Sequence, residues 1–149
     1  MSLRNIKGIH HLKFAVAELS RSLAFYEEAL GAERVGKYDH FDASGNLFAY
    51  ILSVPGLGAF LELRLDPTSA ERQRGFDPIT LLVDNREDLA RWITHFASIK
   101  VPHSDILVGA VGWLVVAEDP DGRRLRFYTA ELHGPELPVS WDSPWLRAP

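Results

Sequence analysis

The sequence predicts an α+β fold built from two copies of one unit, in which a strand and a helix are followed by three short strands. Residues 9–16 alternate apolar and polar side chains, and the residues that follow carry apolar side chains at helical spacing. The same succession returns from residue 78. The 149 residues are enough for one ordinary domain. We therefore expect a single domain with module one at about 6–66, a linker at about 67–75, module two at about 76–130 and a C-terminal arm at 131–149.

The first copy opens with a strand that has two different faces. Leu12, Phe14 and Val16 recur at period two and are expected to pack, whereas His11 and Lys13 fall between them on the opposite face. A helix should follow, because apolar residues come next at three- and four-residue spacings. These residues are Leu19, Leu23, Tyr26, Ala29 and Leu30.

The two predicted helices carry residues suited to their ends. Ser20 is available as the N-cap of the first helix, and Gly31 can end it in a left-handed conformation. Asp84 or Asn85 can cap the second helix. The linker should be irregular, and we place the boundary between the modules within a few residues of Arg72.

The short strands complete each copy. In the first copy they are predicted at about 32–38, 47–54 and 58–65, and in the second around residue 101, at 113–118 and at 123–129. In the last strand of the first copy, Leu61 and Leu63 should pack while Phe60, Glu62 and Arg64 face the other way.

Composition excludes several classes of protein. The formal net charge of −4, without a run of basic residues, argues against nucleic-acid binding. The chain has no cysteine, so it offers neither a disulfide nor a thiolate metal site. An apolar span long enough to cross a membrane is absent from the sequence. We expect a cytoplasmic protein with no nucleic-acid or membrane partner.

The sequence resembles the vicinal oxygen chelate superfamily, which contains glyoxalase I, bleomycin-resistance proteins, fosfomycin-resistance enzymes and extradiol dioxygenases. The matching residues occur in both halves of the chain: His11, Val16, Leu19, Ser22, Phe25, Tyr26, Leu30, Gly31 and the turn Asp119-Pro-Asp-Gly122. The resemblance implies two βαβββ modules that form one curved, mostly antiparallel sheet around a cavity. It also implies a homodimer.

The metal site that this resemblance implies is only half present. Family members take ligands from the first and last strands of each module, and His11 and Glu62 stand at the two positions of module one. In module two the positions hold Pro78 and Arg126. Proline has no side-chain donor and a guanidinium stays protonated, so neither can ligate a cation. A divalent metal at His11 and Glu62, or no cofactor at all, are the two expectations.

The last hairpin indicates what could replace the metal. If Glu118 pairs with Arg123 across the Asp119-Pro-Asp-Gly122 turn, one face of the hairpin carries Trp113, Arg126 and Tyr128. Together with module one, the cavity would then be rich in cations and aromatic rings. The predicted ligand-binding residues are Arg126, Trp113, Tyr128, Arg64, Lys13 and Phe60. Such a cavity suits a small anionic or aromatic molecule.

Plainer interpretations of the same residues stay open. Arg126 could form an ion pair with Glu62 in the vacated metal position, and Trp113 could be core. His10 should point to the packing side because it alternates with His11, and His40 has no ligand spacing. The arm carries Trp141 and Trp145, whose apolar surface could be their own module, the cavity mouth or a partner.

Two functional hypotheses follow. The first is a metal-independent binding protein for a small anionic or aromatic molecule. The second is a divalent-metal-dependent lyase, isomerase or dioxygenase that uses His11 and Glu62. A metal-free catalyst, with Glu62 as general base and Arg126 holding an oxyanion, is a variant of the second.

Overall fold

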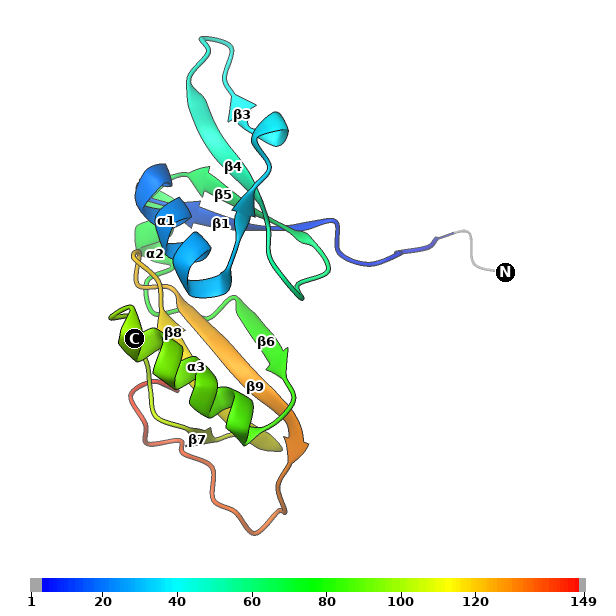
Figure 1. The fold of residues 1–149 in the computed structure, drawn as a ribbon, viewed down its shortest axis with the longest axis vertical. Coiled ribbons are helices and arrows are strands. Elements are labelled where there is room, and N and C mark those ends of the chain that lie inside the picture. The colour runs from blue at the N-terminus through cyan, green and yellow to red at the C-terminus, as the bar shows by residue number, and fades with distance from the viewer. Residues whose placement is uncertain (1–3, 148–149) are drawn as a thin grey trace. The chain divides into compact units, whose positions relative to one another are not determined.

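The computed structural model describes residues 4–147, which form two compact units. The first unit ends at Asp66 and the second begins at Pro67 (Figure 1). Each unit has its own hydrogen-bonded sheet, so the strands form two sheets rather than one. Within residues 4–147, no helix has the length and apolar composition needed to cross a membrane.

Each unit contains one long helix and one sheet, as the internal repeat predicts. The first unit contains β1 (His11–Val16), α1 (Leu19–Leu30), β2 (Glu33–Arg34), the 3-10 helix η1 (Gly36–Tyr38), β3 (His40–Phe41), β4 (Leu47–Ser53) and β5 (Phe60–Leu65). The second contains α2 (Pro67–Arg72), β6 (Ile79–Val83), α3 (Arg86–Ser98), β7 (Leu107–Val108), β8 (Gly112–Glu118) and β9 (Arg124–Leu132).

The two sheets share one topology. The strand order is β1-β5-β4-β2 in the first unit, where β3 also pairs with β4, and β6-β9-β8-β7 in the second. In each unit the first and last strands run parallel, and the remaining pairs are antiparallel. The predicted α+β class with mostly antiparallel pairing is confirmed.

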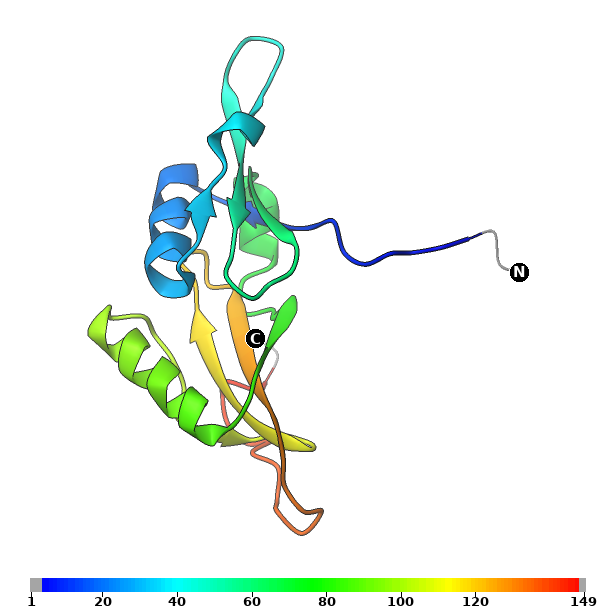
Figure 2. The same ribbon diagram turned by 45° about the vertical axis from the view of Figure 1, so that its right-hand side comes forward.

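One face of the first sheet packs against α1, and the other is left for polar residues. Phe14, Leu61 and Leu63 are at most 4% exposed. The Phe14 ring lies 5.9 Å from the ring of Tyr26 on α1. Figure 2 shows α1 along one side of these strands. The alternation predicted for β1 and β5 is therefore confirmed, and His11, Lys13, Phe60, Glu62 and Arg64 share the face away from α1.

Two of the three predicted helix ends are confirmed. Gly31 ends α1 in the left-handed conformation, with φ of 68°, and the Asn85 side chain accepts a hydrogen bond from the Asp88 N–H at 3.0 Å. The prediction for Ser20 is wrong, because α1 begins at Leu19 after Glu18, and Ser20 lies within the first turn. The predicted irregular linker instead forms α2, for which Pro67 is well suited as the first residue.

The turn that joins β8 to β9 has a different register from the predicted one. The Asp119 N–H donates to the Arg123 carbonyl at 2.8 Å, and Gly122 takes a φ of 77°. The loop thus has three residues, with glycine in the left-handed position of a bulge. Arg123 faces Asp119 rather than Glu118, and Arg124 pairs with Glu118.

This register determines which residues of β8 lie on the same face of the sheet as Arg126. Arg126 lies opposite Val116 and Tyr128 opposite Leu114. Trp113 is on the α3 side, where the Arg86 guanidinium stands 4.0 Å from the centre of its ring. The prediction that Trp113 shares a face with Arg126 and Tyr128 is wrong, because the loop has three residues instead of the predicted four and the register of β9 is therefore shifted by one residue.

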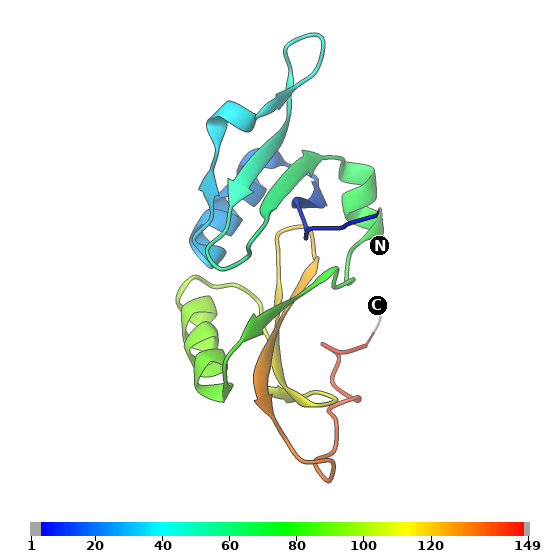
Figure 3. The same cartoon turned by 90° about the vertical axis from the view of Figure 1, so that its right-hand side faces the viewer.

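The C-terminal arm is attached to its own unit. Ser140 exchanges two hydrogen bonds of 3.0 Å with the backbone of Val108 on β7. Arg124 donates to the Arg147 carbonyl at 2.9 Å, and its guanidinium lies 5.5 Å from the Trp145 ring centre. In Figure 3 the arm, in red, runs beside the strands on the side away from α3.

His133 holds the start of this arm with both ring nitrogens. Its Nε2 lies 2.7 Å from the Gly109 carbonyl and its Nδ1 lies 2.7 Å from the Gly134 carbonyl. A carbonyl accepts but cannot donate, so both contacts are hydrogen bonds only when the ring carries two protons. These carbonyls raise the pKa of His133 above its usual value of 6.5, and the nearby Glu136 acts in the same direction.

The raised pKa predicts that protonated His133 stabilises the folded chain. Because the pKa is higher in the folded than in the unfolded chain, this stabilisation is complete below the unfolded value of 6.5 and is lost as pH rises through the folded value. The difference in melting temperature between wild type and His133→Gln should be larger in acid than in mildly alkaline buffer. His103→Gln, which removes one carbonyl contact, is the control. A difference that does not change with pH would contradict the assignment.

Candidate functional site

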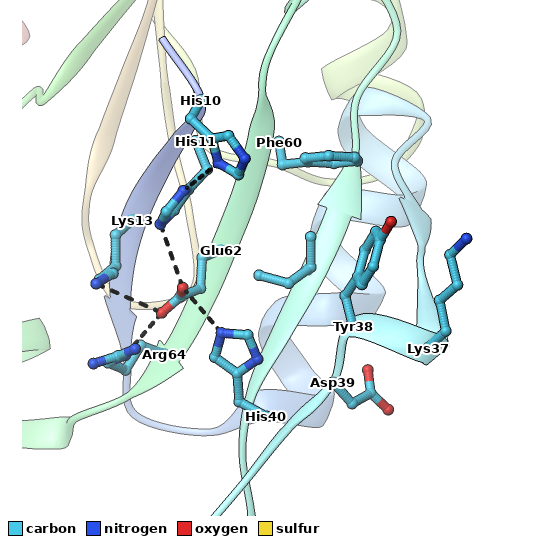
Figure 4. A pocket seen from close by; sticks show the side chains of 11 residues that line it. His10, His11, Lys13, Lys37, Tyr38, Asp39, His40, Phe60, Glu62 and Arg64 are labelled. Carbon is cyan, nitrogen blue, oxygen red and sulfur yellow. Dashed lines mark hydrogen bonds and ion pairs between the residues drawn. The ribbon is translucent and has the colours of Figure 1, made fainter.

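The candidate site is a pocket of about 740 Å³ in the first unit, lined in part by the polar face of its sheet. The parallel pairing of β1 and β5 sets Lys13 beside Glu62 and His11 beside Phe60. Arg64 follows two residues after Glu62 and points to the same face. Figure 4 shows these side chains with those of His10, Lys37, Tyr38, Asp39 and His40 around the pocket.

Glu62 lies at the centre of the polar part of the pocket, and basic groups approach both of its oxygens. Its Oε2 accepts a hydrogen bond from Arg64 Nε at 2.7 Å and lies 3.9 Å from Lys13 Nζ. Its Oε1 lies 3.7 Å from His11 Nε2 and 3.6 Å from His40 Nε2. We call these five residues the Glu62 cluster; dashed lines mark its contacts in Figure 4.

The basic members of the cluster cover the carboxylate. Glu62 is 2% exposed, whereas the side chains of its four partners are between 37% and 47% exposed. A molecule that enters the pocket would therefore meet nitrogen atoms before it met the Glu62 oxygens. This arrangement favours binding of an anion over proton abstraction by Glu62.

His40 belongs to the cluster although its sequence context did not indicate it. His40 pairs with Ala49 on β4, and Ala49 pairs with Arg64 on β5. The small Ala49 side chain between them leaves space for the imidazole above the sheet. Only the pairing of distant strands could have revealed this neighbour, because no local spacing links His40 to Glu62.

His10 also lies at the pocket, so its predicted orientation toward the packing side is wrong. It precedes β1, which begins at His11, and strand alternation does not apply to it. The Nδ1 atoms of His10 and His11 are 3.0 Å apart, so one ring donates to the other. His10 thereby positions the imidazole that faces Glu62.

The other end of the pocket is aromatic. The ring of Tyr38, which is 45% exposed, lies 6.0 Å from the ring of Phe60 in a T-shaped arrangement. Lys37 Nζ stands 5.1 Å from the centre of the Tyr38 ring, and Asp39 is paired with Arg34. The pocket therefore combines a cationic region with an apolar, ring-lined region.

The predicted site residues of the second unit have partners there. Arg126 forms an ion pair with Asp77, a partner that the sequence did not suggest. The Tyr128 hydroxyl accepts hydrogen bonds from the N–H groups of Val111 and Gly112 at 3.0 and 3.1 Å. Trp113 packs between Arg86 and the ring of His133. Each of these three side chains therefore has a partner within the second unit.

The side chains around Glu62 argue against a resident metal at this position. Among residues 4–147, no group of three or more metal-ligating side chains could hold an ion. Pro78 and Arg126 cannot ligate, and one oxygen of Glu62 is already approached by Arg64 and Lys13. Two like charges beside a ligand oxygen would repel a divalent cation.

The sequence profile of the Glyoxalase/Bleomycin resistance protein/Dioxygenase superfamily matches residues 8–127, which extend from the first unit into β9 of the second. The chain belongs to this superfamily. The metallothiol transferase FosB of Lysinibacillus sphaericus (strain C3-41) is 28% identical over 132 residues, covering 85% of each protein. This chain is a superfamily member with fosfomycin-resistance-like relatives.

Solved structures of other members share the fold. A mutant of the fosfomycin resistance protein FosX of Listeria monocytogenes, complexed with Mn(II) and 1S,2S-dihydroxypropylphosphonic acid, matches with a TM-score of 0.67 and 17% identity, over 86% of this chain and 96% of that one. The antibiotic binding protein TnmS3 of Streptomyces sp. CB03234 also gives 0.67 and 17%, over 86% and 99%. At such identities the matches show the fold alone.

The buried Glu62 should contribute to stability as the partner of two permanent cations. Glu62→Gln retains an acceptor for Arg64 but leaves Lys13 and Arg64 without a counter-charge. We expect the free energy of unfolding to fall by about 1–2 kcal/mol, a value lowered by the partial exposure of the partners. Chemical denaturation measures it. Glu33→Gln, at an exposed position of the same sheet, should change it by less than about 0.5 kcal/mol. Equal effects of the two substitutions would contradict this role.

Proposed function

We propose that this superfamily member is a binding protein that holds a small anionic molecule, with an apolar or aromatic part, in the first-unit pocket without a metal. The observation that carries the proposal is the Glu62 cluster, in which a 2% exposed carboxylate holds four more exposed basic side chains at the pocket surface. Lys13 and Arg64 supply permanent positive charge. Anions are attracted to such a surface.

The roles within the pocket follow from position. Arg64 and Lys13 bind the anionic group, and Phe60 contacts the apolar part. Glu62 acts as a positioning residue that orients its partners. Arg126, Trp113 and Tyr128 stay outside this role because their side chains already hold Asp77, Arg86 and two backbone N–H groups.

Binding without catalysis has support among proteins of this fold. TnmS3 is described as an antibiotic binding protein, so the fold is used for binding small molecules. Metal-free catalysis has less support. Its general base, Glu62, is buried beneath basic side chains, and its oxyanion-binding residue, Arg126, is paired with Asp77. The homodimer and the cytoplasmic location remain predictions from resemblance and composition.

The alternative is a divalent-metal-dependent enzyme at His11 and Glu62. One observation favours it: the Nε2 atoms of His11 and His40 face the same Glu62 oxygen at 3.7 and 3.6 Å. Among the relatives, FosX has been solved with Mn(II). Movement of Lys13 and Arg64 away from Glu62 would be required before a cation could approach.

A binding experiment separates the two functions. Calorimetric titration with a panel of small carboxylates, phosphonates and phenols should identify ligands, and Arg64→Gln should weaken binding about tenfold or more because a charge-assisted hydrogen bond is lost. Arg91→Gln, at a 71% exposed position on α3, is the matched control and should bind as wild type does. Elemental analysis should find no stoichiometric metal in the protein. Treatment with a chelator should leave binding unchanged. Binding that is abolished by chelation and restored by Mn²⁺ would instead establish the metal-dependent alternative.

A further inference from the structure

We infer that the first-unit pocket selects an aromatic monocarboxylate, in which a short linker joins the ring to the carboxylate. This inference rests on the proposed function. It further specifies that the ligand carries one negative charge and that a short linker separates its ring from its carboxylate. Three features of the pocket carry it: the number of permanent charges in the Glu62 cluster, the donors of Arg64, and the separation between the cluster and the aromatic end.

The permanent charges of the cluster favour a single negative charge on the ligand. Lys13 and Arg64 are positive and Glu62 is negative, so one positive charge is in excess. Asp39 does not alter this balance because it is paired with Arg34, and Lys37 lies at the other end against Tyr38. A monoanion neutralises the cluster, whereas a dianion adds a negative charge next to Glu62.

The donors of Arg64 suit a planar carboxylate. Glu62 takes the Nε–H of Arg64 at 2.7 Å, and the guanidinium is thereby fixed in orientation. Four further N–H donors remain on its terminal nitrogens, in a plane that matches the two oxygens of a carboxylate. Lys13, with 47% of its side chain exposed, can approach the same group from β1.

The aromatic end lies a short distance from the cluster. Lys13 lies opposite Glu62, which is two residues from Phe60 on one face of β5, so the cationic group and the ring are about 7 Å apart along the strand. The Tyr38 ring stands next to Phe60, at 6.0 Å, and is 45% exposed. A ring attached directly to a carboxylate is too short for this spacing, whereas a linker of about two carbon atoms spans it.

A series of ligands tests the spacing. Benzoate, phenylacetate, 3-phenylpropanoate and 5-phenylpentanoate are titrated calorimetrically into the full chain. Affinity should be highest for 3-phenylpropanoate and should fall again for 5-phenylpentanoate. Simple hydrophobic attraction would instead make affinity rise through the whole series, because each added methylene buries more apolar surface. Phe60→Leu should remove the preference for 3-phenylpropanoate over butanoate.

A second set of ligands tests the charge. 3-Phenylpropanamide is the neutral analogue, and benzylmalonate carries a second carboxylate on the same carbon atom. Wild type should prefer 3-phenylpropanoate to each of them by about tenfold. Lys13→Gln should abolish the preference over the amide, because it should weaken the binding of 3-phenylpropanoate by about tenfold. Glu62→Gln, which raises the excess charge by one, should shift the preference toward benzylmalonate by about tenfold.

The outcomes distinguish this inference from the proposed function. If aliphatic carboxylates or dianions bind as tightly as 3-phenylpropanoate, and their binding depends on Lys13 and Arg64, the ligand class is wrong and the proposed function stands. If none of the anions binds to wild type, both the ligand class and the proposed function are wrong. A peak at 3-phenylpropanoate, lost in Phe60→Leu, together with the opposite charge effects of Lys13→Gln and Glu62→Gln, would establish the ligand class.

Discussion

The arrangement of the candidate site depends on the neutralisation of one buried carboxylate. Glu62 projects from the second strand of its sheet and is 2% exposed, so its charge must be balanced by nearby groups. Arg64 bonds to it from the same strand, Lys13 approaches from β1, and two imidazoles approach its other oxygen. The pairing of β1, β4 and β5 brings these groups to Glu62, and their contacts with it orient them around the pocket.

Much of this site could be predicted from local sequence. Alternation at period two is a local property, and it correctly placed Lys13, Phe60, Glu62 and Arg64 on one face. The repeat of that pattern from residue 78 predicted the second unit, whose strand order β6-β9-β8-β7 matches that of the first. The fold class therefore followed from apolar periodicity and from the resemblance, which needed no knowledge of distant contacts.

What could not be predicted depends on long-range pairing or on a single backbone conformation. His40 reaches Glu62 because β3 pairs with β4 and because the intervening residue is the small Ala49. The register of β9 was wrong by one residue because Gly122 adopts a positive φ and shortens the loop to three residues. In the observed register Trp113 lies on the α3 side. Arg126 forms its ion pair with Asp77 rather than with Glu62.

Under the proposed function, the cluster also explains how Glu62, which the resemblance places at a metal-ligand position, can be buried as a carboxylate without a metal. A divalent cation brings two positive charges to its ligands. Lys13 and Arg64 bring two positive charges to Glu62 as well, and both are side chains held in place by the strands. A cation could therefore approach Glu62 only if Lys13 and Arg64 moved away or were replaced. Under the proposed function, the pocket is an anion site built on the Glu62 carboxylate.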